Sequence, residues 1–165
     1  ASDNQRISKI IQSLRSIFME PERSAERVHL REVFESIHEI VRPELKRRQI
    51  ALQMNQYEDV VINISSSEIH QVLLNLINNA VDSLVSSKSA NPIITIDLQN
   101  LGEAIQIAIS DNGPGVPEPL IPQLFVLLSS TKETGMGLGL WLCKYILERR
   151  DGSIAYTGKI GRAHV

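Results

Sequence analysis

Cysteine is almost absent from this sequence, and so are a basic excess and any long apolar run. Cys143 is the single cysteine, which excludes a disulfide framework and a thiolate metal site and favours a reducing compartment. The net charge of −2, without a basic stripe of interleaved aromatic residues, excludes nucleic acid as a direct partner. No apolar run approaches the ~20 residues that span a bilayer, and no signal peptide opens the chain. We therefore expect no direct contact with a membrane.

Glycine, in contrast, is concentrated in two short turns. Five of the nine glycines lie in Asp111–Val116 and Gly135–Leu140, and glycine lets the main chain approach a bulky ligand because it has no Cβ. The second turn runs into an apolar helical segment, so its free N–H groups and the helix dipole favour phosphate. The first turn presents Asp111, whose carboxylate accepts a hydrogen bond from an amino group. The two turns predict one nucleotide site, with the base at Asp111 and the phosphates at residues 135–139.

The N-terminal segment forms a separate unit in the sequence. Residues 4–19 place apolar side chains at helical spacing, with basic and polar ones on the other side. This helix either packs on the same domain or ends a helical hairpin that dimerises. Pro21 lies in a charged segment that stops the helix. We place the boundary there, with residues 1–22 as the end of a dimerisation hairpin and residues 23–165 as the second domain.

The second domain opens with a helix and two strands. Apolar residues from Leu30 to about Arg48 lie on one helical face. Pro43 lies inside this helix and predicts a bend or an interruption, because proline has no N–H. Residues 50–55 and 59–64 alternate and contain β-branched side chains, so each predicts a strand.

The helix predicted from Ser65 to about Ser86 has two distinct faces. Ser65 and Glu68 have the spacing of a capping box. Apolar side chains fill one face, and a polar stripe on the other contains Glu68, Asn75, Asn79 and Asp82. Asparagine is a poor residue for a helix interior, yet three asparagines lie within five residues here. The stripe is either a solvated face or a row of amides directed at a ligand or at a hard cation such as Mg²⁺.

The remaining chain predicts a hairpin, a flap, a helix and short strands. Residues 93–99 and 104–110 alternate cleanly and predict a β-hairpin that ends at Asp111. Residues 117–134 contain three early prolines and lack a firm period, which is typical of a flap over a pocket. A helix from Leu138 to Arg150 and a strand at 153–157 follow, and another strand begins near Val165.

Four motifs stand in a fixed order over about residues 50–165: Asn75–Ala80, Asp111–Gly115, Leu124–Phe125 with Thr131–Lys132, and Gly135–Leu140. They resemble the N, G1, F and G2 boxes of the catalytic ATP-binding domain of sensor histidine kinases, in the GHKL or Bergerat superfamily with gyrase B and Hsp90. The resemblance implies an α+β fold. It is a two-layer α/β sandwich in which helices cover one face of a mixed sheet, preceded by a helical segment.

The resemblance also implies a role for individual residues. Asp111 binds the adenine amino group, and Asn79 coordinates Mg²⁺ between the phosphates with help from Asn75. Thr131 and Lys132 belong to the ATP lid, and Lys132 reaches the terminal phosphates. The implied catalytic residues are Asn75, Asn79 and Lys132, and the implied ATP-binding residues are Asn75, Asn79, Asp82, Asp111, Gly113, Gly115, Val116, Thr131, Lys132, Gly135, Gly137, Leu138, Gly139 and Leu140.

One position distinguishes two activities within the superfamily. Members that hydrolyse ATP have a glutamate one helical turn before the metal-binding asparagine, where it acts as a general base on water. Here that position is Asn75, which has no useful basicity. The resemblance therefore implies a protein histidine kinase, which transfers the γ-phosphoryl group of Mg-ATP to a histidine nitrogen mainly by positioning and charge stabilisation.

The sequence departs from the family pattern in two places. Phe125–Ser129 replaces the common Phe-x-Pro-Phe-Phe of the F box. Arg162–Ala163 follow Gly161, where the family often has a threonine near the adenine. Both departures concern lid closure or the affinity for ATP, and neither removes a core ligand.

The phosphoacceptor histidine is expected upstream of Ala1. His38 opens a His-Glu-x-x-x-Pro pattern, but it stands too close to Asn79 for the whole second helix that the family has between these sites. We interpret His38 as a surface histidine. The resemblance further implies a homodimer through the N-terminal hairpin, a response-regulator receiver domain as partner, and a cytoplasmic location whether or not the parent protein is anchored to the inner membrane.

Two other functions stay open. The altered lid favours a degenerate module that binds nucleotide weakly or serves as an interaction platform. An anti-sigma-type serine kinase shares the same boxes, although the amphipathic helix at residues 4–19 argues against it.

Overall fold

The computed structural model describes residues 25–55, 59–127, 137–158 and 162–164. The predicted N-terminal helix, its stop at Pro21 and the domain boundary lie outside these residues. So do Thr131, Lys132 and Gly135 of the predicted site. None of the helices in the described part is long and apolar enough to cross a membrane.

A five-stranded mixed sheet forms one layer of the domain. Its strand order is β2-β4-β5-β7-β6, in which β2 and β4 are parallel and the other neighbours are antiparallel. The predicted hairpin is confirmed as β4 and β5, with Ile94 opposite Asp111 at its open end. The strands are Ala51–Met54 (β2), Ile93–Asn100 (β4), Ile105–Asp111 (β5), Ala155–Tyr156 (β6) and Arg162–His164 (β7).

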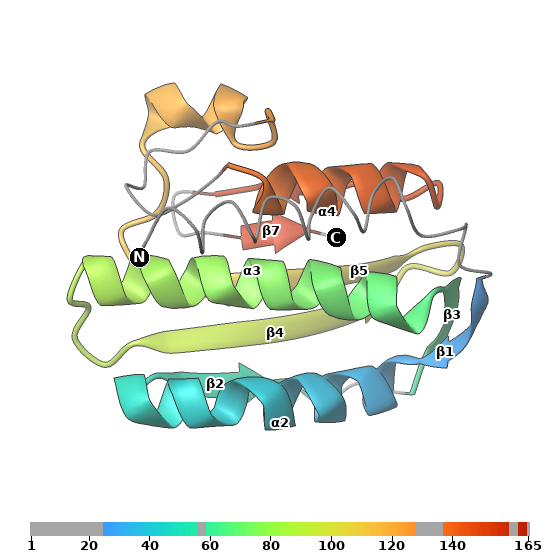
Figure 1. The fold of residues 1–165 in the computed structure, drawn as a ribbon, viewed down its shortest axis with the longest axis horizontal. Helices are drawn as coiled ribbons and strands as arrows, with labels where there is room; N and C mark the ends of the chain where they lie inside the picture. The colour runs from blue at the N-terminus through green and yellow to red at the C-terminus, as the bar shows by residue number, and fades with distance from the viewer. Residues whose placement is uncertain (1–24, 56–58, 128–136, 159–161, 165) are drawn as a thin grey trace, which may run out of the picture.

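Three helices lie side by side over one face of this sheet, as Figure 1 shows. They are Leu30–Arg48 (α2), Ser66–Ser86 (α3) and Gly139–Glu148 (α4). Alternate strand residues face them, so Ile94 and Ile96 of β4 and Ile107 and Ile109 of β5 are all buried. The predicted α+β sandwich, with helices on one face of a mixed sheet, is confirmed.

A separate two-stranded sheet was not predicted in full. Strand β1, Glu26–His29, pairs antiparallel with β3, Val61–Ile64. The sequence predicted β3 but predicted no strand at residues 26–29. Only Val28 of β1 is buried, so this short strand has no alternating pattern that a period could reveal. His29 Nδ1 lies 2.9 Å from Asp59 Oδ2. This contact joins the end of β1 to the segment just before β3.

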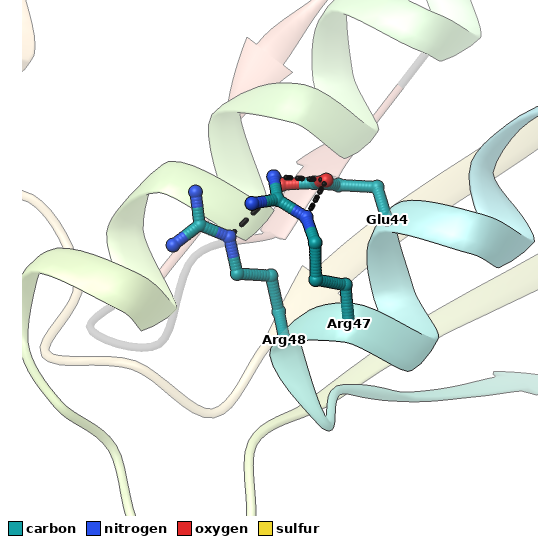
Figure 2. Close-up of polar contacts among 3 residues, drawn as sticks. All are labelled: Glu44, Arg47 and Arg48. Atoms are coloured by element: carbon teal, nitrogen blue, oxygen red, sulfur yellow. Dashed lines mark hydrogen bonds and ion pairs between the residues drawn. The ribbon is translucent and has the colours of Figure 1, made fainter.

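Helix α2 is continuous through Pro43, so the predicted interruption does not occur. Its last turn is basic, which suits the negative end of the helix dipole. Arg47 Nε and Arg48 Nε each donate to Glu44 at 2.9 Å (Figure 2). These hydrogen bonds, first that from Arg47 and then that from Arg48, hold the pKa of Glu44 below its ordinary value. His38 is exposed on the same helix, as expected of a surface histidine.

Helix α3 begins where the sequence placed it, but the predicted capping box is wrong. Ser65 is the N-cap residue, but its side chain makes no capping hydrogen bond to a main-chain N–H of the helix; its Oγ lies 2.9 Å from Ser67 Oγ instead. The Glu68 side chain binds Arg150, with Oε2 at 2.9 Å from both Nε and Nη2. Glu68 therefore connects the start of α3 to the residue just beyond α4, which is a contact that local sequence spacing does not reveal.

The predicted flap lies only partly within the described residues. Its first part forms a 3₁₀ helix, Glu118–Gln123 (η1), beyond the end of β5. Pro119 occupies an early position of this helix, where its missing N–H leaves no hydrogen bond unmade. Residues 128–134 of the predicted flap lie outside the described residues.

Phe34 provides a test of the helical layer. Its side chain is completely buried under α2, so Phe34→Ala should lower the free energy of unfolding by about 3–5 kcal/mol. Ile40 on the same helix is 54% exposed, and Ile40→Ala should cost less than about 1 kcal/mol. Urea unfolding followed by circular dichroism measures both, and equal losses would contradict this packing.

Candidate functional site

Helix α3 presents three polar side chains along one stripe. Asn75, Asn79 and Ser83 follow one another at intervals of four residues, so they share one side of the helix. All three are half-buried. At 1.5 Å per residue, the stripe extends about 12 Å along the helix axis.

The first glycine turn lies against one end of this stripe. Asp111 is the last residue of β5, and its Oδ1 accepts a hydrogen bond from the Gly113 N–H at 2.9 Å. A Cβ built on Gly113 would lie 2.6 Å from Asp111 Oδ1 and 2.9 Å from Ser83 Oγ. A side chain at residue 113 therefore requires the Asp111 carboxylate and the Ser83 hydroxyl to move from these positions.

Burial raises the pKa of the Asp111 carboxyl, and the hydrogen bond from Gly113 opposes this shift only in part. The folded protein thus holds the proton of Asp111 more tightly than the unfolded chain does. Ionisation of Asp111 consequently lowers stability as the pH rises through its pKa. A ligand that donates an N–H to this carboxylate relieves that cost.

Two residues that sequence reasoning did not single out bind the main chain around this turn. Asn112 Oδ1 accepts from the Ile93 N–H at 2.8 Å, and its Nδ2 donates to the Asn91 carbonyl at 2.9 Å. The Tyr156 hydroxyl accepts from the Val116 N–H at 3.2 Å. The only sequence signal was that Asn112 lies inside the G1 motif and Tyr156 inside a predicted strand.

The second glycine turn lies against the other end of the stripe. Gly137 has φ +64°, a left-handed conformation that glycine adopts without cost. Leu138 is buried, and α4 begins at Gly139. Asn75 Nδ2 donates to the Gly139 carbonyl at 3.4 Å and lies 3.7 Å from Cys143 Sγ. Asn75 thus joins α3 to the first turns of α4.

Cys143 is packed between these two helices. Its side chain is completely buried, and this burial raises the pKa of the thiol to about 12. The thiol is therefore neutral at physiological pH and has no role as a nucleophile.

The structure thus brings most of the predicted site together. Residue 79 lies between Asn75, which meets the second turn, and Ser83, which meets the first. Asp82 is exposed on α3, whereas Val116 and Leu140 are half-buried in the two turns. Gly115 has φ +76° in the first turn. The predicted roles of these residues in binding ligand or metal stay predictions.

A cavity of about 650 Å³ lies elsewhere, near the closed end of the β4–β5 hairpin. It is lined by β3, by the hairpin turn around Gly102 and by the end of α4 at Arg150. None of the predicted site residues that the structure describes lines it; these residues lie on α3 and at the two glycine turns instead.

Residues 64–164 match the family model described as histidine kinase-, DNA gyrase B- and HSP90-like ATPase. The chain belongs to this family. The match includes α3, both glycine turns and the C-terminal strands. The expectation of a sensor-kinase type ATP-binding domain from the four boxes is confirmed at this level.

Two curated relatives are sensor proteins. The phosphoglycerate transport system sensor protein PgtB of Salmonella typhimurium is 31% identical over 159 residues, 95% of this chain and 23% of PgtB. The C4-dicarboxylate transport sensor protein DctS of Rhodobacter capsulatus is 37% identical over 93 residues, 56% of this chain and 14% of DctS. The chain therefore spans about a quarter or less of the length of these two relatives.

Solved histidine kinases share the fold. The nucleotide-free catalytic domain of the histidine kinase ThkA aligns with a TM-score of 0.75 at 24% identity, over 86% of this chain and 92% of that domain. ThkA in complex with the response regulator protein TrrA aligns with a TM-score of 0.72 at 21% identity, over 98% of this chain and 47% of that chain. At these identities the likeness shows the fold.

The crowding around Gly113 can be tested by comparing its substitution with that of Gly139, where a Cβ has space. Gly113→Ala should lower the free energy of unfolding by about 1–3 kcal/mol, because the new Cβ would overlap Asp111 and Ser83. At Gly139, a Cβ meets its nearest atom, Asn75 Cγ, at an ordinary 3.8 Å. Gly139→Ala should therefore be neutral or stabilise the first turn of α4 by about 0.5 kcal/mol. Urea unfolding compares the two variants, and a harmless Gly113→Ala would contradict the crowding around this turn.

Proposed function

We propose that this chain is the ATP-binding catalytic domain of a sensor histidine kinase. In this function it transfers the γ-phosphoryl group of ATP to a histidine on a dimerisation hairpin, for relay to a response regulator. The observation that supports it most is the α3 stripe, because one helix contacts both glycine turns and places Asn79 between them. Family membership and the sensor relatives support the same conclusion.

The base is proposed to bind at the first turn. The half-buried carboxylate of Asp111 has its pKa raised by burial, and the bond from Gly113 offsets this only in part. An exocyclic amino group of adenine supplies the missing donor. Gly113 and Gly115 let the main chain lie against the base, and Val116 lines its side.

The phosphates are proposed to bind between Asn79 and the second turn. Gly137, Leu138, Gly139 and Leu140 present main-chain N–H groups at or just before the start of α4, where the helix dipole favours anions. Gly135, which lies outside the described residues, is proposed to bind the phosphates with them. Thr131 and Lys132 belong to the lid in this proposal. Lys132 neutralises charge on the terminal phosphates, and Asp82 lies at the rim on α3.

The residues present would fit a Mg²⁺ ion bound beside the phosphates. Mg²⁺ prefers oxygen ligands, keeps several waters and needs only one or two protein ligands when phosphates supply the rest. The amide oxygen of Asn79 is such a ligand, and Asn75 lies one helical turn away. When bound, the ion stabilises the negative charge that develops during transfer.

Hydrolysis of ATP is disfavoured by Asn75, which lies one helical turn before Asn79. Position 75 holds an amide, which does not accept a proton from water at neutral pH. Its Nδ2 moreover binds the α4 main chain at Gly139, and its Oδ1 accepts from Gln71 at 3.3 Å. The site therefore positions a phosphoryl group for an attacking histidine and does not activate water.

The partners are proposed from the same relationship. The response-regulator complex of ThkA supports a receiver domain as the partner that takes up the phosphoryl group. The amphipathic segment at residues 4–19 supports a homodimer through a helical hairpin. Residues 1–22 as the end of that hairpin and residues 23–165 as the catalytic domain remain our proposed division, and the cytoplasm is the proposed location.

Asn79 and Asp111 test the nucleotide site. Asn79→Ala and Asp111→Asn should each weaken ATP binding at least about 100-fold, since each removes a charged or metal-mediated contact. Asp111→Asn should keep the wild-type stability at pH 7 or exceed it, because it removes a carboxylate whose pKa burial raises. Isothermal titration calorimetry with and without Mg²⁺ measures the affinities.

The exposed neighbour Asn78 is the matched control for Asn79. Asn78→Ala should bind ATP like the wild type. Undiminished ATP affinity in both Asn79→Ala and Asp111→Asn would overturn the proposed site.

Phosphoryl transfer is tested with γ-labelled Mg-ATP and a separate histidine-bearing hairpin. We expect an acid-labile label on the hairpin, because phosphohistidine is formed. Nucleotide binding without any label would instead identify a binding module, and an acid-stable label would identify a serine kinase. A label on the chain itself that His38→Gln removes would show that the acceptor lies within it.

A further inference from the structure

We propose that Asn112 and Tyr156 are positioning residues of the base site, which hold the first glycine turn from two sides. The inference rests on the proposed function, because the turn is taken as the place where adenine binds. Neither side chain is assigned a contact with the nucleotide. Both act through the main chain of residues 111–116.

Asn112 continues the hydrogen bonding of the hairpin by one residue beyond the last pair of the β4–β5 ladder. The ladder between β4 and β5 ends where Ile94 faces Asp111, and the Asn112 N–H then donates to the Ile93 carbonyl at 3.2 Å. The side-chain amide replaces the next peptide of the strand, since it accepts from the Ile93 N–H and donates to the Asn91 carbonyl. The direction in which the chain leaves Asp111 is therefore fixed by three hydrogen bonds.

The segment to which Asn112 binds is itself held by the sheet. The Pro92 carbonyl accepts from the Ala51 N–H at 2.9 Å, at the start of β2. Asn91 has φ +52°, a left-handed conformation that asparagine tolerates and that orients its carbonyl. The bonds of Asn112 thus connect the turn to the edge strand β2 through residues 91–93.

Tyr156 holds the far end of the turn. It lies on β6, opposite Ala163 of β7, and Ala163 in turn faces Ile109 of β5. Its hydroxyl reaches back from the other edge of the sheet to the Val116 N–H. The turn between Asn112 and Val116 therefore has one end bonded toward β2 and the other bonded to β6.

Between these two ends, the turn contains glycines, at which the main chain rotates most easily. Gly115 stands immediately before Val116 with φ +76°, and an unconstrained glycine samples many conformations. Fixing both flanks selects the conformation in which Asp111 and the Gly113 main chain face the base together. Such preorganisation increases affinity because the ligand does not have to order the turn.

The experiment compares two variants, one that lacks the Tyr156 hydroxyl and one that lacks the Asn112 side-chain amide, with a matched control for each. Tyr156→Phe removes only the hydroxyl and should weaken ATP and ADP binding by the same factor, about three- to tenfold. Asn112→Ala removes both side-chain bonds and should weaken binding about tenfold or more. The control Tyr145→Phe alters a half-buried tyrosine of α4 that stacks on Trp141. The control Asn100→Ala alters an amide that binds Gly102 at the other end of the hairpin.

Calorimetry measures the affinities of the 165-residue chain and its variants, and ¹H–¹⁵N spectra report the Val116 amide without nucleotide. We expect Tyr156→Phe to shift the Val116 resonance and to leave the unfolding midpoint close to that of the wild type. Wild-type affinity in both Tyr156→Phe and Asn112→Ala, or equal losses in the two controls, would overturn the inference. A wild-type chain that binds no ATP would overturn the proposed function instead.

Discussion

The contact of one helix with two turns is the constraint on which the site depends. Helix α3 touches the first turn through Ser83 and the start of α4 through Asn75. The spacing of these contacts follows from the helix repeat, which fixes side chains four residues apart on one side. Because the same helix buries eight side chains on its other side, its position relative to the sheet is set by the core. The site therefore inherits its dimensions from the packing of the domain.

Much of this arrangement follows from sequence periodicity. The β4–β5 hairpin and the helices α2 and α3 were predicted closely, because each shows a repeat of two or of 3.6 over many residues. Strand β1 was missed because four residues with one buried side chain carry no period. The capping box at Ser65 failed for a different reason, since Glu68 finds a stronger partner in Arg150, which lies 82 residues further along the chain. Contacts of this kind depend on the assembled fold.

The same distinction applies to the candidate site. Asp111, Gly113 and Asn79 were recognisable because carboxylate, glycine and amide types have chemical meaning in a motif. Tyr156 was not recognisable, because its hydroxyl meets Val116 only after β7 has paired with both β5 and β6. The crowding around Gly113 by Ser83 likewise arises from the packing of α3 on the hairpin. Sequence thus named the groups that we propose to face a ligand more readily than the groups that support them.

Helix α4 is attached unequally at its two ends. Beyond its C-terminal end, Arg150 makes two charge-assisted contacts of 2.9 Å with the largely shielded Glu68. Near its N-terminal end, Asn75 Nδ2 reaches the Gly139 carbonyl at 3.4 Å, which is long for an N–H···O hydrogen bond, and Cys143 Sγ at 3.7 Å. The start of α4 therefore depends on apolar packing, through the buried side chains of Leu138, Leu142 and Cys143, more than on polar contacts.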